Sequence, residues 1–475
     1  MNLTLDLGLS KVDDLLKRFE EIHNYIYAND GLSTQQTLEE FVKILFVKIS
    51  DENNRQKLFR ITSEEFNDLK YTSSSLDFVD RLNNLFEITK KDFKDIFDQD
   101  DKIRLSAISL GFTVNKLQSI YLSDSSTDAK GLAFQKFLER QEKGGRGQFF
   151  TPEPVINFCV EIIQPKPDDY ILDPACGSGG FLISSLNFLS KNYPNLHRES
   201  FVSNNLFGID INKSIARIAK MKLLLEYNEQ ANILCANSLD DLDEIKLLIA
   251  NESKKDIMEG FDVILTNPPF GTVGKITNSK ILSQYELGHK WIYGENNFTK
   301  TKTLSNGVPS EILFIERCIQ LLKEGGRLGI VLPNGHFENS SLEYLRNYIK
   351  LKAKILAIIN LPQETFIPYG TGVKTSILFI EKDSENKTTE YPIFFGKICK
   401  PGYQGNKNGT PIYKKDKYGL QLKDSFGNPI LDEDFTQVIQ DYRAYQKKKE
   451  IISENSFSLD FKEINGRFDF DYYSP

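Results

Sequence analysis

The sequence is poor in cysteine and has no long apolar segment. Its five cysteines among 475 residues are scattered, without a Cys-x-x-Cys pair, which argues against a disulfide framework and a zinc site. No apolar run approaches the roughly 18 residues that span a membrane. The N-terminal MNLTLDLGLSKVDD lacks the basic and apolar blocks of a signal peptide. We therefore expect a cytoplasmic protein with no metal site and no membrane association.

An excess of positive charge is also missing. The chain has 59 basic and 66 acidic residues, for a formal net charge of −7. A protein that binds nucleic acid alone usually has a basic surface, so any such face must be local or completed by a partner. The composition, 40% hydrophobic and 26% charged, is typical of a globular protein of two or three domains.

The pattern of apolar residues divides the chain into three parts. In residues 1–135 apolar residues recur at three- and four-residue steps, as in the stretch 38–49, which indicates helices. Residues 136–400 alternate short β-branched runs with helical patterns. Residues 401–475 are polar and rich in turns before a last helical segment. We therefore predict an N-terminal helical domain, a central α/β domain and a C-terminal tail with a helix.

Seven short apolar runs in the central part are candidate strands. Helical patterns separate several of them, and this alternation predicts a mostly parallel sheet that helices cover on both faces. A ligand of such a sheet binds at the carboxyl ends of its strands. The candidate strands are residues 170–173, 206–210, 232–236, 261–266, 327–332, 355–360 and 374–380.

The first candidate strand leads into a glycine-rich turn, Asp173-Pro-Ala-Cys-Gly-Ser-Gly-Gly180, and then a helix. Glycines let the backbone approach a ligand closely, and the N-terminus of the helix favours a negative group. The turn lacks the Lys-Ser/Thr pair of a phosphate-binding loop and the G-x-G-x-x-G spacing of a dinucleotide site. Two interpretations are left, a site for S-adenosylmethionine and a purely structural turn.

Acidic and polar residues at neighbouring strand ends favour S-adenosylmethionine. Asp173 could hold the ammonium of its methionine end, and Asp210, which ends the second strand, could accept both ribose hydroxyls. Asn237 follows the third strand, where an amide could meet the adenine edge, although a strand-ending turn explains it equally well. The candidate cofactor-binding residues of these turns are Asp173, Ala175, Gly177, Gly179, Gly180, Asp210, Ile211, Asn237 and Ser238.

The fourth candidate strand stops at Asn267-Pro268-Pro269-Phe270, the candidate catalytic residues. Prolines fix the backbone and cannot donate hydrogen bonds, so the strand ends in a stiff loop. The amine of adenine is a poor nucleophile because its lone pair is delocalised into the ring. The Asn267 side-chain oxygen and the Pro268 carbonyl could accept its two hydrogens, and Phe270 could stack on a flipped-out base, for ~1–3 kcal/mol. A proline-stiffened surface turn is the alternative.

With these motifs the chain resembles the modification subunits of type I restriction-modification systems, and more broadly the N6-adenine DNA methylases. The resemblance covers about residues 144–382 and, more weakly, the N-terminal domain. Gly147–Pro152 resembles an element that precedes the cofactor turn, which implies that Phe150, Thr151 and Pro152 help to cover the cofactor. Residues 329–335 and 372–378 resemble elements that wall the base pocket. Phe366 is a second aromatic contact or an ordinary core residue.

The resemblance implies a seven-stranded sheet with an antiparallel last strand, and a helical domain that closes on double-stranded DNA. The implied partners are a specificity subunit and a second modification subunit, which a restriction subunit can join. The segment 467–475 resembles the start of a target-recognition domain, which makes it a remnant of a specificity region, a docking handle for one, or a frayed tail. The insert 272–309, with the only tryptophan, Trp291, contacts DNA, gates the base pocket or simply packs.

Two other functions are open. Enzymes that methylate other planar amines, namely cytosine N4, an RNA adenine or a protein glutamine, tolerate a related motif. Asn267 in place of serine disfavours cytosine, and the Gly147–Pro152 element disfavours RNA and protein substrates. A non-catalytic subunit that clamps DNA is the third function, and the intact Asp173, Asp210 and Asn267 speak against it.

Overall fold

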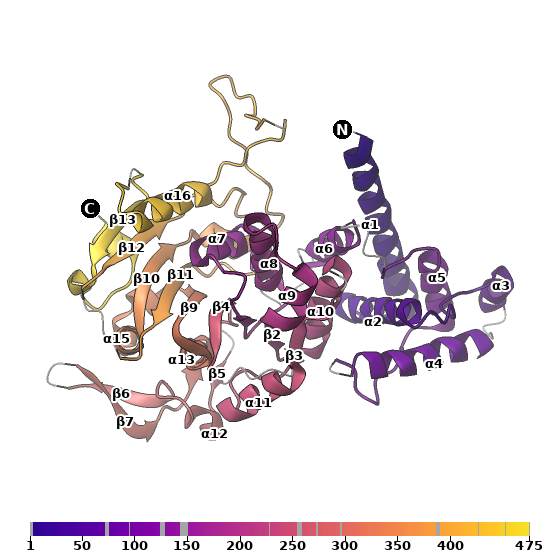
Figure 1. The fold of residues 1–475 in the computed structure, drawn as a ribbon, viewed down its shortest axis with the longest axis horizontal. Coiled ribbons are helices and arrows are strands. Elements are labelled where there is room, and N and C mark those ends of the chain that lie inside the picture. The colour runs from indigo at the N-terminus through magenta and orange to yellow at the C-terminus, as the bar shows by residue number, and fades with distance from the viewer. Residues whose placement is uncertain are drawn as a thin grey trace.

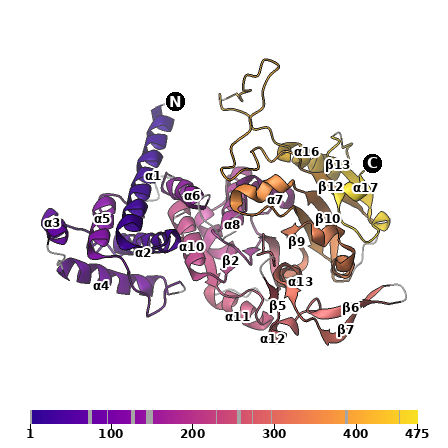
Figure 2. The same ribbon diagram turned by 180° about the vertical axis from the view of Figure 1, so that it is seen from behind.

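The protein divides into a helical bundle and a larger α/β part that lie side by side (Figures 1 and 2). No described helix is both long enough and apolar enough to cross a bilayer. This computed structural model describes residues 3–71, 76–94, 96–123, 129–142, 151–227, 229–253, 259–271, 274–294, 297–385, 390–425, 427–451 and 453–474.

The N-terminal bundle has its own hydrophobic core. Phe19, Phe41 and Phe137 pack edge to face there, with ring centroids 5.4 to 6.1 Å apart. The second helix begins at a capping box, in which Ser33 and Gln36 bind each other's backbone N–H groups. The helices of the bundle are α1 (Leu3–Asp30), α2 (Thr34–Asn53), α3 (Ser63–Tyr71), α4 (Leu76–Asp92), α5 (Ala107–Leu117) and α6 (Ala129–Glu142).

The α/β part is built on one nine-stranded sheet of order β13-β12-β10-β11-β9-β4-β1-β2-β3. The first seven of its strands in chain order are the seven predicted from the sequence. Among those seven, only β11 runs antiparallel to its neighbours, as the resemblance implied. The strands are β1 (Ile171–Asp173), β2 (Leu206–Asp210), β3 (Asn232–Cys235), β4 (Phe261–Thr266), β9 (Leu322–Pro333), β10 (Ala353–Asn360), β11 (Thr375–Lys382), β12 (Pro392–Lys397) and β13 (Ser456–Asp460).

Two strands beyond the expected seven extend the sheet at the β10 edge. Strand β12 lies parallel to β10, and β13 pairs antiparallel with β12. Phe395 of β12 and Phe457 of β13 stack face to face with ring centroids 5.0 Å apart. The segment 401–475 is thus joined to the sheet, because its strand β13 pairs with β12. The predicted domain boundaries stay predictions.

Helices cover both faces of the sheet because alternate strand residues point to opposite sides. In β1, Ile171 packs on one face and Leu172 on the other. The first face is covered by α7 (Glu153–Ile163), α8 (Gly180–Asn192), α9 (Arg198–Asn205), α10 (Lys213–Tyr227) and α16 (Phe435–Gln446). The second face is covered by α11 (Leu242–Ser253), α13 (Ser310–Leu321), α15 (Glu343–Lys352) and α17 (Phe470–Tyr473).

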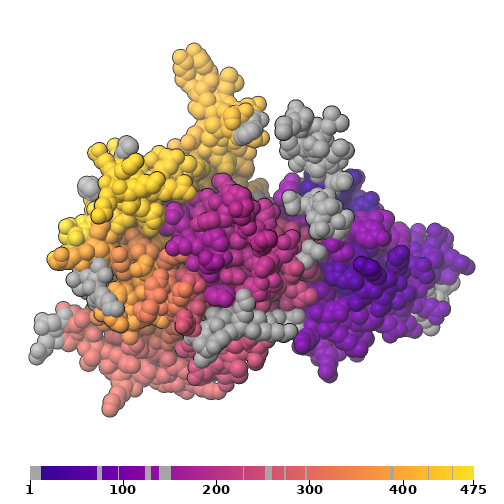
Figure 3. All heavy atoms as spheres, viewed as in Figure 1, coloured from indigo at the N-terminus to yellow at the C-terminus, as the bar shows by residue number. Residues whose placement is uncertain are grey.

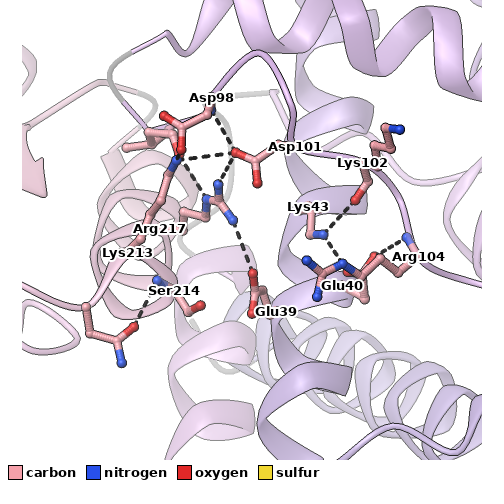
Figure 4. Close-up of polar contacts among 12 residues, drawn as sticks. Glu39, Glu40, Lys43, Asp98, Asp101, Lys102, Arg104, Lys213, Ser214 and Arg217 are labelled. Carbon is pink, nitrogen blue, oxygen red and sulfur yellow. Dashed lines mark hydrogen bonds and ion pairs between the residues drawn. The ribbon is translucent and has the colours of Figure 1, made fainter.

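Helix α10 joins the two parts because it belongs to both cores. Its Ala216 and Leu223 pack on the sheet, whereas other apolar residues of the helix belong to the bundle core. Arg217 belongs to the same helix, and its side chain is 2% exposed. Arg217 donates to the Ile96 carbonyl at 2.9 Å and pairs with Glu39 and Asp101 of the bundle (Figure 4).

The insert between β4 and α13 is ordered over its described residues. Strands β6 and β7 form a hairpin, and β5 pairs with β8. Trp291 of the hairpin lies on Tyr344, with ring centroids 6.1 Å apart, and donates to the Glu286 carbonyl at 3.1 Å. Trp291 therefore packs. The elements are β5 (Lys275–Ile276), α12 (Ser279–Leu282), β6 (His289–Tyr293), β7 (Phe298–Leu304) and β8 (Val308–Pro309).

Candidate active site at the carboxyl ends of β1 and β4

Hydrogen bonds from its own backbone N–H groups stabilise the glycine-rich turn after β1. The Ala175 N–H donates to Asp173 Oδ1 at 3.0 Å, and the Cys176 N–H donates to the Ile209 carbonyl of β2 at 2.9 Å. Gly177 has a φ of +52°, and a Cβ built there would meet nothing within 4 Å. Gly179, with a φ of +82°, starts α8 without a side-chain cap. The turn therefore presents an open backbone and an uncapped helix N-terminus.

Asp173 lies buried beside this turn. Its side chain accepts the Ala175 N–H, and the residue is only 1% exposed. Burial, together with the nearby charge of Asp210, raises the pKa of Asp173 to about 7. A cation placed against this carboxyl group would favour its ionised form.

Asp210, at the end of β2, braces the glycine turn. Its carboxylate accepts the Gly177 N–H at 3.0 Å and the Asn212 N–H at 2.8 Å. Burial raises the pKa of Asp210, although both N–H groups act in the opposite direction. The next residue, Ile211, is 70% exposed. The end of β2 therefore carries both an acid that stabilises the glycine turn and an exposed apolar side chain.

Asn237 and Ser238 close the turn after β3. The Asn237 amide donates to Asp240 at 2.9 Å and accepts the Leu239 N–H at 3.2 Å. The Ser238 hydroxyl donates to the Pro174 carbonyl at 2.5 Å, which ties this turn to the glycine turn. Both side chains are thus engaged within the turns, and their role toward a cofactor stays a prediction.

The Asn267 loop after β4 is anchored on both sides. Asn267 donates through Nδ2 to the Thr151 hydroxyl at 3.0 Å, while its Oδ1 is buried without a partner among the described residues. The Pro269 carbonyl accepts the Ser310 hydroxyl at 2.9 Å, and Glu311 accepts the Gly271 N–H at 2.6 Å. These contacts fasten the loop to the start of α13, so a free acceptor is held in a fixed place.

The other residues of the loop differ in exposure. Pro268 is buried and Pro269 is exposed. Phe270 is 8% exposed and belongs to the hydrophobic cluster on the first face of the sheet. Phe366 is fully buried in the same cluster, so it packs as a core residue. A stacking role of Phe270 stays a prediction.

One cavity of about 300 Å³ joins the two loops, which is within the range of small-molecule sites. Nine other predicted residues do not line the cavity, namely Pro152, Gly179, Asp210, Ile211, Asn237, Ser238, Pro268, Pro269 and Phe270. Phe150 lies outside the described residues. The predicted residues that line the cavity are Thr151, Asp173, Ala175, Gly177, Gly180 and Asn267.

The cavity also has walls that the sequence analysis missed. Tyr369 comes from the 3₁₀ segment η2 (Gln363–Tyr369), and Tyr403 follows β12. The Tyr403 hydroxyl donates to the Thr365 carbonyl at 2.7 Å, which holds it against η2. No motif marks Tyr403, and only its place after a Pro-Gly turn in the sequence suggests a fixed position.

The chain matches known proteins over most of its length. Residues 125–470 match the family described as N-6 DNA Methylase. The chain belongs to this family.

This N-6 DNA methylase family member is 26% identical over 361 residues to the EcoEI methylase subunit of a type I restriction enzyme from Escherichia coli. The match covers 74% of this chain and 64% of the EcoEI subunit. The MjaVIII methylase subunit from Methanocaldococcus jannaschii is 24% identical over 470 residues, or 93% of this chain and 68% of that subunit.

Solved structures share the fold of this N-6 DNA methylase family member. A chain of a type I R-M system superposes with a TM-score of 0.64 at 21% identity, covering 94% of this chain and 87% of that one. The type I restriction-modification methyltransferase subunit from Streptococcus thermophilus gives 0.62 at 16% identity, covering 98% and 100%. These likenesses confirm the predicted α/β fold, a large and mostly parallel sheet preceded by a helical domain.

Proposed function

We propose that this chain is the modification subunit of a type I restriction-modification system, a site-specific methyltransferase acting on adenine N6 in double-stranded DNA. One observation carries the proposal. The side-chain oxygen of Asn267 is buried and has no hydrogen-bond partner in the described part of the chain, and Asn267 lines the same cavity as Asp173 and Gly177. An unpaired buried acceptor costs free energy, so its retention beside a ligand cavity supports a substrate hydrogen bond.

The cavity has the chemistry that S-adenosylmethionine requires. The buried Asp173 carboxyl would hold the ammonium, and the uncapped N-terminus of α8 would receive the carboxylate. A side chain at Gly177 would project into open space, which leaves room for a ligand against the backbone. When bound, S-adenosylmethionine supplies an electrophilic methyl group.

The Asn267 loop would prepare the adenine amine for attack. Asn267 Oδ1 and the Pro268 carbonyl accept the two amine hydrogens, which draws the nitrogen lone pair out of the ring. The hydrogen bond from Asn267 to Thr151 and the contacts of the loop with α13 keep these acceptors in place before the base arrives. As the nitrogen takes the methyl group, the surplus amine proton passes to solvent.

A partner is part of the proposal. The net charge of −7 gives the chain no general attraction for DNA. The EcoEI relative is a subunit of a type I restriction enzyme. We infer that a specificity subunit reads the DNA sequence for two copies of this chain, and that a restriction subunit can join them.

Methyl-labelled cofactor and hydrolysis of the modified substrate test the proposal. The chain, purified in complex with its proposed specificity subunit, is expected to label duplexes that contain adenine and to yield N6-methyladenine. Adenine-free duplexes, RNA and protein serve as controls. Label in N4-methylcytosine, RNA or glutamine, or no label at all, would contradict the proposal.

A further inference from the structure

A branched arm, which we define as residues 400–434, rises from the body between β12 and α16 (Figures 1 and 3). Three short segments meet in it through a ring of backbone hydrogen bonds of 2.8 to 2.9 Å. In this ring, Lys414 donates to Ile430, Ile430 to Leu422, and Leu422 to Lys414. The junction leaves two branches, the turn 416–420 and a second branch in which the Asp424 N–H donates to the Asn428 carbonyl at 2.9 Å. Closed backbone pairing of this kind gives the arm a defined shape.

The root of the arm forms part of the cavity wall. Gly402, Tyr403, Gly409, Pro411 and Leu431 line the same cavity as Asn267 and Gly177. The Tyr403 hydroxyl fastens this root to the Thr365 carbonyl of η2. The arm therefore starts at the rim of the cavity that would receive a substrate base.

The outer half of the arm carries positive charge that is not neutralised. Lys414, Lys415, Lys417 and Lys423 are exposed, and none has a carboxylate partner among the described residues. At the root, by contrast, Lys400 pairs with Asp432 at 3.1 Å.

The acidic residues of the two turns are directed toward their own backbone. Asp416 accepts the N–H groups of Tyr418 at 2.8 Å and Leu420 at 2.9 Å, and Asp424 accepts that of Asn428 at 2.9 Å. These carboxylates hold the turns closed. The branches thus present lysines outward on a chain whose net charge is −7.

Apolar side chains stand among these lysines. Tyr418 is 76% exposed and Leu420 is 68% exposed, both in the turn 416–420. Proteins that contact DNA grooves combine lysines for the phosphates with apolar side chains that reach the base edges. The same combination is uncommon on a surface that faces only water.

We propose that the branched arm binds the backbone of duplex DNA beside the flipped base. The inference rests on the proposed function, because a base inside the cavity stays joined to its strand and brings the flanking phosphates past the rim. Lys415, Lys417 and their neighbours neutralise these phosphates, and Tyr418 enters the adjacent groove. Charge favours DNA over a protein partner, which would bury four unpaired ammonium groups.

The salt dependence of DNA binding tests the arm. The variant Lys415→Gln/Lys417→Gln is compared with wild type in the complex with the specificity subunit, on a duplex containing the recognition site. Each lost phosphate contact lowers the slope of log K against log salt by about 0.9, so a loss of about two is expected. Affinity at moderate salt should fall on the order of tenfold. Cofactor affinity and labelling at saturating DNA should not change.

The matched control is Lys166→Gln/Lys191→Gln, which removes two exposed lysines, one before the amino end of β1 and one in the last turn of α8. It should leave the slope as in wild type. An arm variant with a wild-type slope and affinity would overturn the inference. The inference would also be overturned if the arm variant bound the specificity subunit more weakly while its salt slope stayed as in wild type. If wild type itself methylates no adenine, the proposed function fails instead.

Discussion

Asn267 donates a hydrogen bond through Nδ2 to the Thr151 hydroxyl at 3.0 Å, and its Oδ1 atom has no partner within the residues that the structure describes. The two residues come from distant parts of the sequence, one from the start of α7 and one from the end of β4. In this arrangement the Thr151 hydroxyl binds the NH₂ end of the amide, and the oxygen end stays available. An adenine amine needs an acceptor, so the orientation of this one side chain decides whether the loop can act.

The substitution Thr151→Val tests this orientation. Without the hydroxyl the amide of Asn267 can rotate, and its NH₂ group would then oppose the amine. The loss of one hydrogen bond corresponds to about 1 kcal/mol, so kcat should fall about fivefold. KM for DNA should change little. Thr151→Ser, which keeps the hydroxyl, should restore the rate, whereas equal losses in both variants would mean that Thr151 acts only through packing.

Asp173 should make cofactor binding depend on pH. Burial raises its pKa to about 7 in the cofactor-free protein, and a bound ammonium would lower that pKa. Binding therefore releases a proton below about pH 7, and affinity should weaken by up to about tenfold per pH unit there. Calorimetry at about pH 6 and about pH 8 measures this. Asp173→Asn should bind weakly and equally at both values, and a wild type without pH dependence would contradict the role of Asp173.

The same raised pKa has a consequence for folding. The folded, cofactor-free protein keeps a proton on Asp173 that the unfolded chain releases above its ordinary pKa of 3.8. Asp173 should therefore reduce the free energy of unfolding as pH rises from about 4 to about 7. Asp173→Asn should remove this part of the pH dependence in denaturant titrations.

Gly177→Ala should harm cofactor binding much more than folding. A left-handed conformation costs a side chain roughly 1–2 kcal/mol, and the new methyl group would project into the cavity. Gly325, with a φ of +74° and no atom within 4 Å of a built Cβ, offers a matched position outside the cavity lining. Gly325→Ala should lose similar stability and bind the cofactor normally. Equal cofactor affinities in the two variants would exclude Gly177 from the site.

Asp101→Ala should loosen the helical bundle from the sheet. Burial alone would raise the pKa of Asp101, but the Asp98 N–H and the cations Arg217 and Lys213 lower it. The pairing thus stabilises the fold at neutral pH and is lost on acidification. Removing one partner of the buried Arg217 should cost about 3 kcal/mol in urea unfolding. The neighbouring exposed Asp100→Ala is the control, and equal stabilities would contradict a structural role of the ion pair.

Much of the sheet could be predicted because its central strands are apolar runs that end at turns. Strands β1, β2, β3 and β4 lie within one residue of their expected bounds. Strand β13 escaped prediction because its sequence, Ser-Phe-Ser-Leu-Asp, is short and half polar, and it becomes a strand only through pairing with β12. Edge strands depend on a partner that a local pattern does not contain.

Some features of the candidate site could likewise be predicted from the sequence, and others could not. The loops of Gly177 and Asn267 carry motifs, and the carboxyl ends of neighbouring parallel strands must meet, so their shared cavity was predictable. Tyr403 was not, because it reaches the cavity only when the arm folds back on η2. The dual engagement of Asp210 with Gly177 and Asn212 was also hidden, since a sequence shows an acid but not the N–H groups around it.

The central claim is that the free oxygen of Asn267 activates the adenine amine beside a separately bound cofactor. The most direct measurement compares Asn267→Ala with wild type in two assays on the same preparation, methyl transfer to an adenine duplex and calorimetric cofactor binding. The account predicts that transfer is abolished while the cofactor dissociation constant stays within about twofold of wild type, a difference of about 0.4 kcal/mol. Transfer near the wild-type rate, or loss of cofactor binding together with transfer, would contradict it.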